Sequence, residues 1–426
     1  MSRAETGVAK PCDDGSALFY NPSAILESDG LTISGGLTVV SAGGDFTDDR
    51  TGRETEIQND PIPVPHLFAT YGVTPDLALG LGVYVPYGLE TKWPETWDGA
   101  FEGYDNGLQS FYIQPTIAYQ ITDRIQIGGG PIIGISSVEL NQRLDLSQQA
   151  VPSPAVPQGT TFGNLGIPFH TAFADSKLEA TGATAFGGHV GLTVQVTDRI
   201  RVGTRYMLPM TFEYDGDATF TPVETGLILS SSNPLTGEPT PVDALVAGQF
   251  DGDGSLVDQS VETEIELPAQ FAAGLSFDAT ERLTLLADYQ WMGWSSFDEI
   301  VLEFDRIDDS VREENYNNTS AFRFGAEYVV TEALTVRTGY LFNETAAPDE
   351  TVTPLLPEND RNHLTVGVGW KPTSTFEVNL AYQYLNQNDR RGRTRELREG
   401  ETAADANSGL YSFGANLFGA TLTLHL

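Results

Sequence analysis

Hydrophobic and polar residues alternate with a period of two along most of this chain. In residues 200–208 the odd positions carry Arg201, Gly203, Arg205 and Met207, while the even positions are mostly apolar. The same alternation recurs in residues 334–342 and 376–384. Because successive side chains of a strand point to opposite faces, this period predicts β-strands. One face is rich in Leu, Val, Phe and Tyr and the other in Arg, Glu, Gln and Asn, which suits lipid outside and a wet lumen inside.

A short turn pattern separates neighbouring strands. Each copy contains a Thr next to an acidic residue, Pro or Ser, and such side-chain oxygens bond nearby backbone N–H groups in tight turns. The copies occupy residues 73–77, 121–125, 196–200, 279–283, 330–334 and 372–376.

The links at the opposite ends of these strands are long and polar. They occupy residues 44–62, 88–106, 140–177, 215–258, 305–318, 344–361 and 389–408. Six short turns and seven long loops connect fourteen strands, and short turns on one side with long loops on the other are typical of outer-membrane barrels. We therefore expect an all-β, fourteen-stranded antiparallel barrel over residues 31–426, with both termini in the periplasm. A soluble β-sandwich is the alternative, but its loops would not sort so cleanly by length.

Composition narrows the class. No run of about 18 uncharged apolar residues occurs, so no transmembrane helix is expected. The formal charge of −36 argues against a nucleic-acid partner, since phosphate contacts need a basic surface, and leaves open acidic loops that bind divalent cations. Residues 1–6 lack the apolar core of a signal peptide, so we expect that the signal was removed or that the gene start was assigned late.

Residues 1–30 do not alternate. Pro11 and Pro22 interrupt Ala- and Leu-containing turns, which suggests short helical pieces. A barrel of about fourteen strands has a lumen that needs filling, and a compact N-terminal plug would fill it. The alternative is a loose periplasmic tail.

The third predicted strand has an unusual composition. Gly80 and Gly82 remove side chains from the lumen face, and Pro86 removes a donor from the strand ladder. This pattern predicts a kink or wall opening, although the glycines could instead make room for the plug.

Four arginines are expected in the lumen by strand parity: Arg201, Arg205, Arg323 and Arg337. One of them could hold a carboxylate, and the alternative is that they pair with lumen acids such as Glu213, Glu327 or Glu377.

The two longest loops contain apolar clusters, which need either mutual packing or a ligand. Their apolar residues include Phe162, Leu165, Ile167, Phe169, Leu227, Ile228, Leu229, Leu245 and Val246. The run from Asp251 to Ser255 lacks the spacing of a complete calcium loop, and the five histidines have no metal-ligand spacing. No nucleotide-binding or hydrolase motif appears, so we expect no cofactor, no metal and no enzymatic activity.

An ordered set of motifs resembles the FadL/TodX family of outer-membrane transporters. The run Asp13-Asp14-Gly15-Ser16-Ala17-Leu18-Phe19-Tyr20-Asn21-Pro22-Ser23 resembles the family's N-terminal hatch, with Ser23 in place of the usual Ala. Further matches are Pro86-Tyr87-Gly88-Leu89, Glu266-Leu267-Pro268-Ala269, Trp294-Ser295-Ser296-Phe297, Arg337-Thr338-Gly339-Tyr340 and Pro357-Glu358-Asn359-Asp360-Arg361. The resemblance covers nearly the whole chain in the right order.

The resemblance implies a barrel plugged by a hatch that contains Asp13, Asp14, Ser16, Phe19, Tyr20, Asn21, Pro22 and Ser23. It implies passive uptake of long-chain fatty acids or of aromatic and aliphatic hydrocarbons, captured by the two longest loops and released sideways near Gly80, Gly82, Pro86, Tyr87 and Gly88. The family's fatty-acid-binding members carry basic residues at stretches that correspond to 135–138 and 318–320, where this chain has none. Neutral hydrocarbons therefore remain open as substrates.

The expected surroundings are outer-membrane lipid and lipopolysaccharide, and we expect a monomer. Two other functions stay open at this point. A general or polysaccharide-type porin would have an open lumen without a hatch, and a barrel enzyme would need a nucleophile and a base that converge from different strands.

Overall fold

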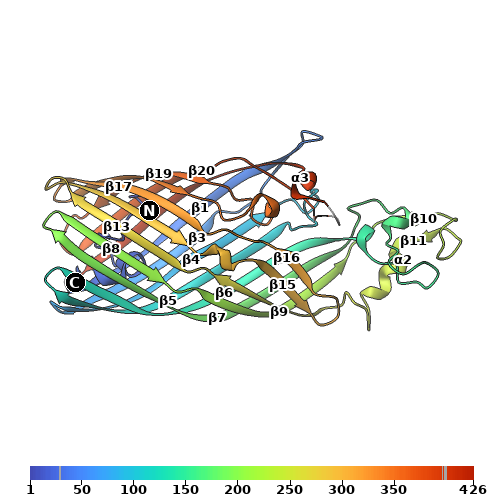
Figure 1. Cartoon of the computed structure of the whole chain (residues 1–426), viewed down its shortest axis with the longest axis horizontal. Coiled ribbons are helices and arrows are strands. Elements are labelled where there is room, and N and C mark those ends of the chain that lie inside the picture. Colours follow the sequence, from blue (N-terminus) through green and yellow to red (C-terminus); the bar gives the residue numbers. More distant parts are fainter. Residues whose placement is uncertain (28–29, 396, 398–400) are drawn as a thin grey trace.

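The computed structural model describes residues 1–27, 30–395, 397 and 401–426. The chain forms a closed antiparallel β-barrel of 14 strands, and each of these barrel strands is called a wall here. Short helical pieces lie inside the barrel and in its loops (Figure 1). The prediction of this fold is confirmed. Within the described residues, no helix is long and apolar enough to cross a membrane.

Several walls of the barrel consist of two consecutive strands. In chain order the walls are β1 (Leu31–Asp48), β3 (Ile62–Thr74), β4 (Leu77–Lys92), β5 (Asp105–Thr122), β6 (Ile125–Asp145), β7 (Ala172–Thr197), β8 with β9 (Ile200–Met207, Met210–Pro222), β12 with β13 (Gln259–Leu267, Gln270–Asp278), β14 with β15 (Leu283–Met292, Glu299–Phe304), β16 with β17 (Ser310–Glu313, Thr319–Thr331), β18 (Leu334–Asn343), β19 (Arg361–Trp370), β20 with β21 (Phe376–Gln387, Arg390–Gly392) and β22 (Gly409–His425). The barrel closes where β1 pairs with β22, from Thr32↔His425 to Asp48↔Gly409. Closure pairs the backbone groups that a bilayer could not solvate.

The remaining elements lie in the N-terminal segment and the loops. They are α1 (Ala17–Tyr20), η1 (Pro22–Glu27), β2 (Glu54–Glu56), η2 (Leu146–Gln148), η3 (Gly163–Leu165), β10 (Ile228–Leu229), β11 (Thr240–Pro241), α2 (Val242–Val246), η4 (Ala247–Gln249), η5 (Trp294–Ser296), η6 (Asp349–Thr351) and α3 (Ala403–Ala406).

All of the predicted short turns connect neighbouring strands at one end of the barrel, the end where the C-terminus lies (Figure 1). In each turn a Thr side-chain oxygen accepts a hydrogen bond from a backbone N–H two or three residues later, at 3.0–3.3 Å. The sequence prediction of turn chemistry is therefore confirmed residue by residue.

The face of the strands that carries the apolar side chains changes along the length of the barrel. Near the short turns, apolar side chains point outward: Leu79, Ile117 and Trp370 are about half exposed, while their neighbours point into the lumen. Further along, the polarity reverses. In β12 the acidic Glu262 and Glu264 point outward, whereas Ile265 is buried inside. The first arrangement is a lipid-facing belt, and the second is the pattern of a sheet with water outside and an apolar interior.

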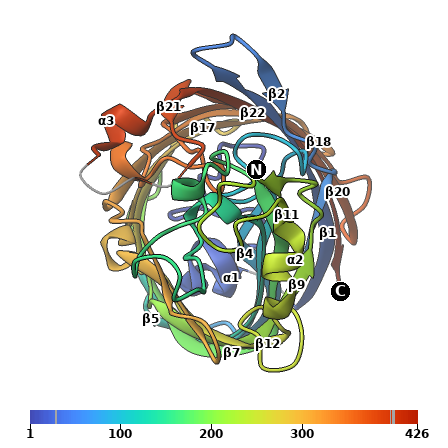
Figure 2. The ribbon, with the colours of Figure 1, turned by 90° about the vertical axis from the view of Figure 1, so that its right-hand side faces the viewer.

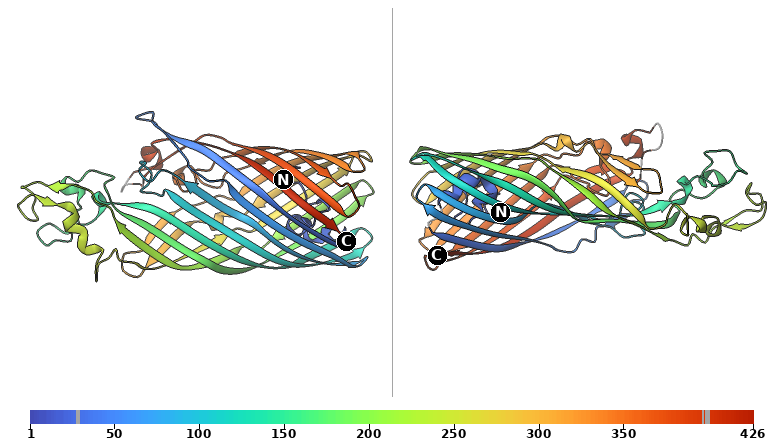
Figure 3. Two further views of the ribbon diagram at one scale, coloured as in Figure 1. Left: turned by 180° about the vertical axis from the view of Figure 1, so that it is seen from behind. Right: turned by 90° about the horizontal axis from the view of Figure 1, so that it is seen from below.

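Strands β6, β7 and β9 run well past the rest of the barrel rim and carry a projecting arm (Figure 3). These strands extend into the stretches 140–177 and 215–258, which the sequence pattern predicts to be loops. The difference arises because their outward residues, such as Lys177 and Asp217, are polar there, so no lipid-facing stripe marks them as strand.

Residues 1–27 lie inside the barrel at the end with the short turns, and Figure 2 shows α1 within the ring of strands. Leu18 and Ile25 are fully buried against the inner wall.

Candidate functional site

An apolar cavity of about 540 Å³ lies in the loop-side half of the lumen. A volume in this range is typical of small-molecule sites. Its walls include Ile62, Leu89, Leu108, Val138, Leu140, Leu178, Ile265, Leu267, Trp294, Phe297, Ile300, Leu302, Leu355, Leu356 and Phe413. Leu89, Leu267, Trp294 and Phe297 belong to motifs of the family resemblance, whereas the other residues were not predicted to line a site. The signal that could have found these others is the reversed polarity of the outer strand halves.

Four of the motifs that carry the family resemblance meet at this cavity. Pro86, Tyr87 and Gly88 come from β4, Leu267 ends β12, Trp294 and Phe297 come from the segment around η5, and Pro357, Glu358 and Arg361 follow η6. Residues that are up to 275 positions apart in the chain, Pro86 and Arg361, thus form one site.

Tyr87 connects two of these motifs across the lumen. Its hydroxyl donates to the carbonyl oxygen of Pro268 at 3.1 Å and accepts from Gln270 Nε2 at 2.6 Å. These contacts hold the irregular part of β4 against the link between β12 and β13.

The barrel wall is interrupted beside the cavity. β3 pairs with β4 only from Leu67↔Val83 to Thr74↔Leu77. In the described part of the chain, β1 is therefore the one strand that pairs with residues 62–66 of β3. On the other edge, the β4–β5 register shifts between Tyr84 and Tyr87. Cavity-lining residues stand on both sides of this interruption, with Ile62 on β3 and Gly88 on β4.

Gly80 and Gly82, at which the sequence pattern predicts a wall opening, lie between the interruption and the short turns. Gly80 pairs with Thr70 and Gly82 with Phe68, so both are in the hydrogen-bonded part of β3 and β4. A side chain at Gly80 would collide with Leu18 Cδ2 of the hatch at 2.7 Å. The structure therefore places Gly80 opposite the hatch and Pro86, Tyr87 and Gly88 at the interruption.

Acidic and basic side chains stand at the loop end of the cavity. Glu314 is almost fully buried, and burial raises the pKa of its carboxyl to about 7, although Arg312 and Arg393 oppose the shift. Arg312 and Glu314 both line the cavity. The carboxyl of Glu314 is therefore partly neutral near neutral pH.

A chain of aromatic rings leads from the cavity to the hatch. Tyr87 is 6.2 Å from Trp294 and 6.2 Å from Tyr112, measured between ring centroids. Tyr112 is in turn 6.0 Å from Tyr84, which makes an edge contact with Phe19 of the hatch at 5.2 Å.

The Asn-Pro-Ser turn fastens the hatch to the wall. Asn21 Nδ2 donates to the carbonyl oxygens of Val8 (2.7 Å) and Leu192 (3.2 Å) and to Thr193 Oγ1 (3.1 Å), while Asn21 Oδ1 accepts from Ser23. Ser23 Oγ lies 2.7 Å from Thr193 Oγ1. A Cβ at Gly191 would lie 2.1 Å from Asn21 Oδ1, so this wall position must be glycine for the turn to dock.

The other predicted hatch residues have varied surroundings. Asp14 Oδ1 accepts from the Ser16 N–H at 3.0 Å, and Asp13 lies 3.8 Å from Lys371 Nζ. Pro22 is buried, and Tyr20 packs edge-on against Phe19 with 5.1 Å between centroids.

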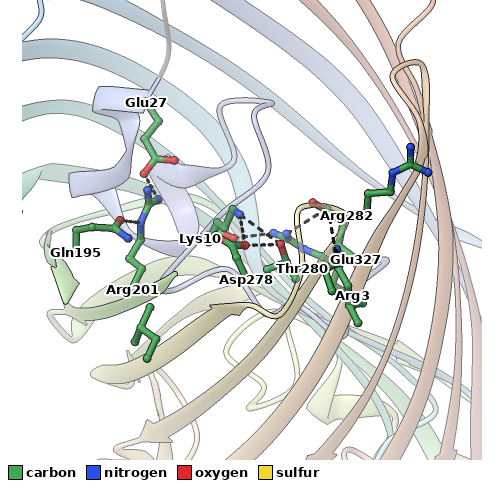
Figure 4. Close-up of polar contacts among 12 residues, drawn as sticks. Arg3, Lys10, Glu27, Gln195, Arg201, Asp278, Thr280, Arg282 and Glu327 are labelled. Carbon is green, nitrogen blue, oxygen red and sulfur yellow. Dashed lines mark hydrogen bonds and ion pairs between the residues drawn. The ribbon is translucent and has the colours of Figure 1, made fainter. Parts of the chain in front are cut away.

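Ion pairs join the hatch to separate walls near the end of the barrel with the short turns (Figure 4). Arg3 lies 3.3 Å from Glu327 on β17, Lys10 lies 2.8 Å from Asp278 on β13, and Glu27 pairs with Arg201 on β8. Figure 4 also shows Gln195, whose Oε1 accepts from Arg201 Nε at 2.9 Å.

All four predicted lumen arginines point inward. Arg337 pairs with Glu327 at 2.7 Å, Arg323 with Glu5 at 3.5 Å and Arg201 with Glu27, whereas Arg205 has no ion pair within the described residues. The placement of Glu213 in the lumen is wrong. Pro209 interrupts the wall between β8 and β9 and shifts the parity, so Glu213 points outward.

The predicted capture residues divide into two groups. Phe162, Ile167, Leu229 and Val246 are buried in a core shared by the two arm loops, with Leu165, Leu227 and Leu245 packed against it. Phe169 and Ile228 are 40% and 65% exposed. Most of the apolar residues of the arm therefore pack on one another, and Phe169 and Ile228 are the two predicted capture residues whose side chains are exposed.

Comparisons with known proteins bear on this architecture. The family model described as "Outer membrane protein transport protein (OMPP1/FadL/TodX)" matches residues 1–425. The chain belongs to this family. Transport rather than catalysis is the activity of the OMPP1/FadL/TodX proteins, and they reside in the outer membrane, which confirms both expectations for this chain.

Individual relatives in the family have low sequence identity to this chain but align with it over most of their length. Outer membrane protein P1 of Haemophilus influenzae is 23% identical and covers 96% of this chain and 87% of its own length. The long-chain fatty acid transport protein of Escherichia coli is 21% identical, with 98% and 91% covered.

Solved structures of the family share the fold. A FadL homologue of Pseudomonas aeruginosa gives a TM-score of 0.82 at 20% identity and covers 100% of this chain and 97% of its own. The toluene transporter TodX of P. putida gives 0.70 at 17% identity, with 97% and 94% covered.

Proposed function

We propose that this chain carries hydrophobic small molecules passively through the outer membrane by way of the apolar cavity and the interrupted wall between β3 and β4. The observation that supports it is that one cavity has apolar walls and reaches both edges of this interruption, through Ile62 and Gly88. Apolar molecules enter the hydrated sugar layer of lipopolysaccharide only with difficulty, but they dissolve readily in the bilayer beneath it. A sideways exit would bypass that barrier without an energy source.

The substrates we propose are long-chain fatty acids and aromatic or aliphatic hydrocarbons. One relative is named for long-chain fatty acids and one solved structure for toluene. The apolar walls and aromatic rings of the cavity accommodate either class, since both depend on burial of apolar surface.

The hatch is proposed to close the direct path to the periplasm. Capture on the arm is proposed for Phe169 and Ile228, the two most exposed of the predicted capture residues.

The test uses purified protein in vesicles whose outer leaflet is lipopolysaccharide. With no energy source present, we expect the protein to accelerate transfer of hexadecanoic acid or toluene into the vesicle membrane and to leave a disaccharide outside. Entry of the disaccharide at the rate of an open pore would favour the porin alternative instead. Equal transfer with and without protein would overturn the proposal.

A further inference from the structure

Prolines alternate along the part of β3 that borders the interruption. The chain reads Pro61-Ile62-Pro63-Val64-Pro65, and Pro63 and Pro65 lie within β3. Both side chains are exposed, whereas Ile62 lines the cavity. Proline has no backbone N–H to give to a strand ladder, so it is rare inside a sheet and is found at free edges.

Hydrogen bonds at the foot of β1 show which neighbour each residue of β3 faces. In an antiparallel strand the N–H and C=O of one residue point to the same neighbour, and the neighbour alternates along the chain. Leu31 exchanges both bonds with Leu426, at 3.0 and 2.8 Å, whereas the Gly72 N–H donates to the carbonyl oxygen of Gly30 at 2.9 Å. Even-numbered residues of β1 and β3 therefore face each other, and their register has no shift up to residue 62.

Pro63 and Pro65 are odd-numbered, so their backbone atoms face β4 across the interruption. The same parity holds nearer the short turns, where the odd-numbered Leu67 pairs with Val83 of β4. The even-numbered residues next to the prolines keep their pairing with β1. Proline thus stands at the two positions of β3 whose N–H groups would be needed to continue the ladder with β4.

This edge of β3 is unable to pair and is also compatible with lipid. Carbonyl oxygens of β4 would find no donor at Pro63 or Pro65, and each pyrrolidine ring occupies the space from which an N–H would point. Leu67, two residues from Pro65 on the same face, belongs to the lipid-facing belt and is exposed. Free N–H groups beside this belt would be costly, because hydrocarbon cannot solvate them, and a proline edge has none.

We propose that Pro63 and Pro65 are positioning residues that hold the exit between β3 and β4 permanently open. This inference rests on the proposed function, because it takes the interruption to be the exit. The exit is then a fixed aperture rather than a gate, and no strand movement is needed to open it for each ligand. With an N–H at both positions, β3 and β4 would continue to pair toward the loops and the aperture would close.

The experiment restores the missing donors with Pro63→Thr plus Pro65→Thr in the full chain. One readout is an NMR contact, in detergent micelles, between the backbone N–H at position 65 and β4. The other is transfer of hexadecan-1-ol into vesicles whose outer leaflet is lipopolysaccharide. We expect the contact to appear and transfer to fall about tenfold, since two added backbone hydrogen bonds favour the paired strands by about that factor. Pro65→Thr alone should give the contact and a smaller fall.

Val64→Thr is the matched control, because it places the same side chain between the two prolines, where the N–H already faces β1. It should transfer the alcohol at the rate of the unmodified chain. The proposal is overturned if the double variant, or Pro65→Thr where the double variant does not fold, shows no contact with β4. It is also overturned if Val64→Thr slows transfer as much as the double variant does. Contact with β4 at an unchanged rate of transfer would instead count against the exit in the proposed function.

Discussion

The hydroxyl of Tyr87 lies 3.1 Å from the carbonyl oxygen of Pro268, on the opposite side of the lumen. Tyr87 belongs to the part of β4 where the register with β5 shifts, and Pro268 links β12 to β13. A single side chain therefore braces the interrupted section of the wall against the link between two strands on the opposite side.

Replacing Tyr87 with Phe should destabilise the barrel. The change leaves the Pro268 carbonyl and the Gln270 amide without a partner, which typically costs about 1–3 kcal/mol for buried polar groups. Urea unfolding in phospholipid vesicles measures the loss. Tyr340→Phe is the control, because its hydroxyl bonds to Asn362 at an exposed position where water can substitute, so a change below about 0.5 kcal/mol is expected. Equal losses in both variants would deny Tyr87 a bracing role.

Filling the wall interruption should block sideways exit. Gly88 lines the cavity, and an added Cβ there would meet only Leu108 O at 3.8 Å, so Gly88→Phe can be built without a clash at the backbone. We expect transfer of hexadecan-1-ol into lipopolysaccharide-coated vesicles to fall about tenfold or more because the bulky ring occupies the exit. Gly43→Phe, at a β1 position with nothing within 4 Å, should transfer the alcohol normally. Normal transfer by Gly88→Phe would rule out this exit.

Loosening the hatch should make the pore conduct ions. Asn21→Ala removes three hydrogen bonds that join the hatch turn to Val8, Leu192 and Thr193. Each lost bond to a buried partner costs about 1 kcal/mol or more, so open periods should become more frequent in planar-bilayer recordings. Asn164→Ala in the arm is the control, and its conductance should not differ from that of the unmodified chain. Deletion of residues 1–27 should give a permanently open pore, and baseline conductance after that deletion would refute the plug.

Local chemistry explains which features the sequence could predict. The turns depend on a Thr oxygen and a few neighbouring N–H groups, and the lipid belt depends on a strict two-residue period, so both can be read from short windows. The hatch turn at Asn21 was recognisable from its resemblance to the family's hatch motif, although its wall partner Thr193 was not.

Long-range effects explain what the sequence could not predict. The interruption at Pro209 reverses the parity of all later residues in that wall, so Glu213 was assigned to the wrong face. The cavity is formed by side chains from many separate walls, and no window contains more than a few of them. Phe162 and Ile167 look like free apolar surface until the partner loop that buries them is placed.

Ligand binding should depend on pH through Glu314. Burial raises the pKa of this carboxyl from 4.5 to about 7, against the opposing charges of Arg312 and Arg393 and with Glu102 and Tyr316 beside it. An apolar ligand in the cavity removes more water from Glu314, so the ligand favours the protonated form and binding takes up a proton. Affinity for hexadecan-1-ol should therefore be fully present below about pH 6 and should fall several-fold as the pH rises through about 7 to 8.5.

Calorimetric titration across this range measures how the affinity changes with pH. Glu314→Gln should bind the alcohol with no such slope, whereas Glu313→Gln, which changes an exposed neighbour, should keep it. A slope that persists in Glu314→Gln would assign the titration to another group.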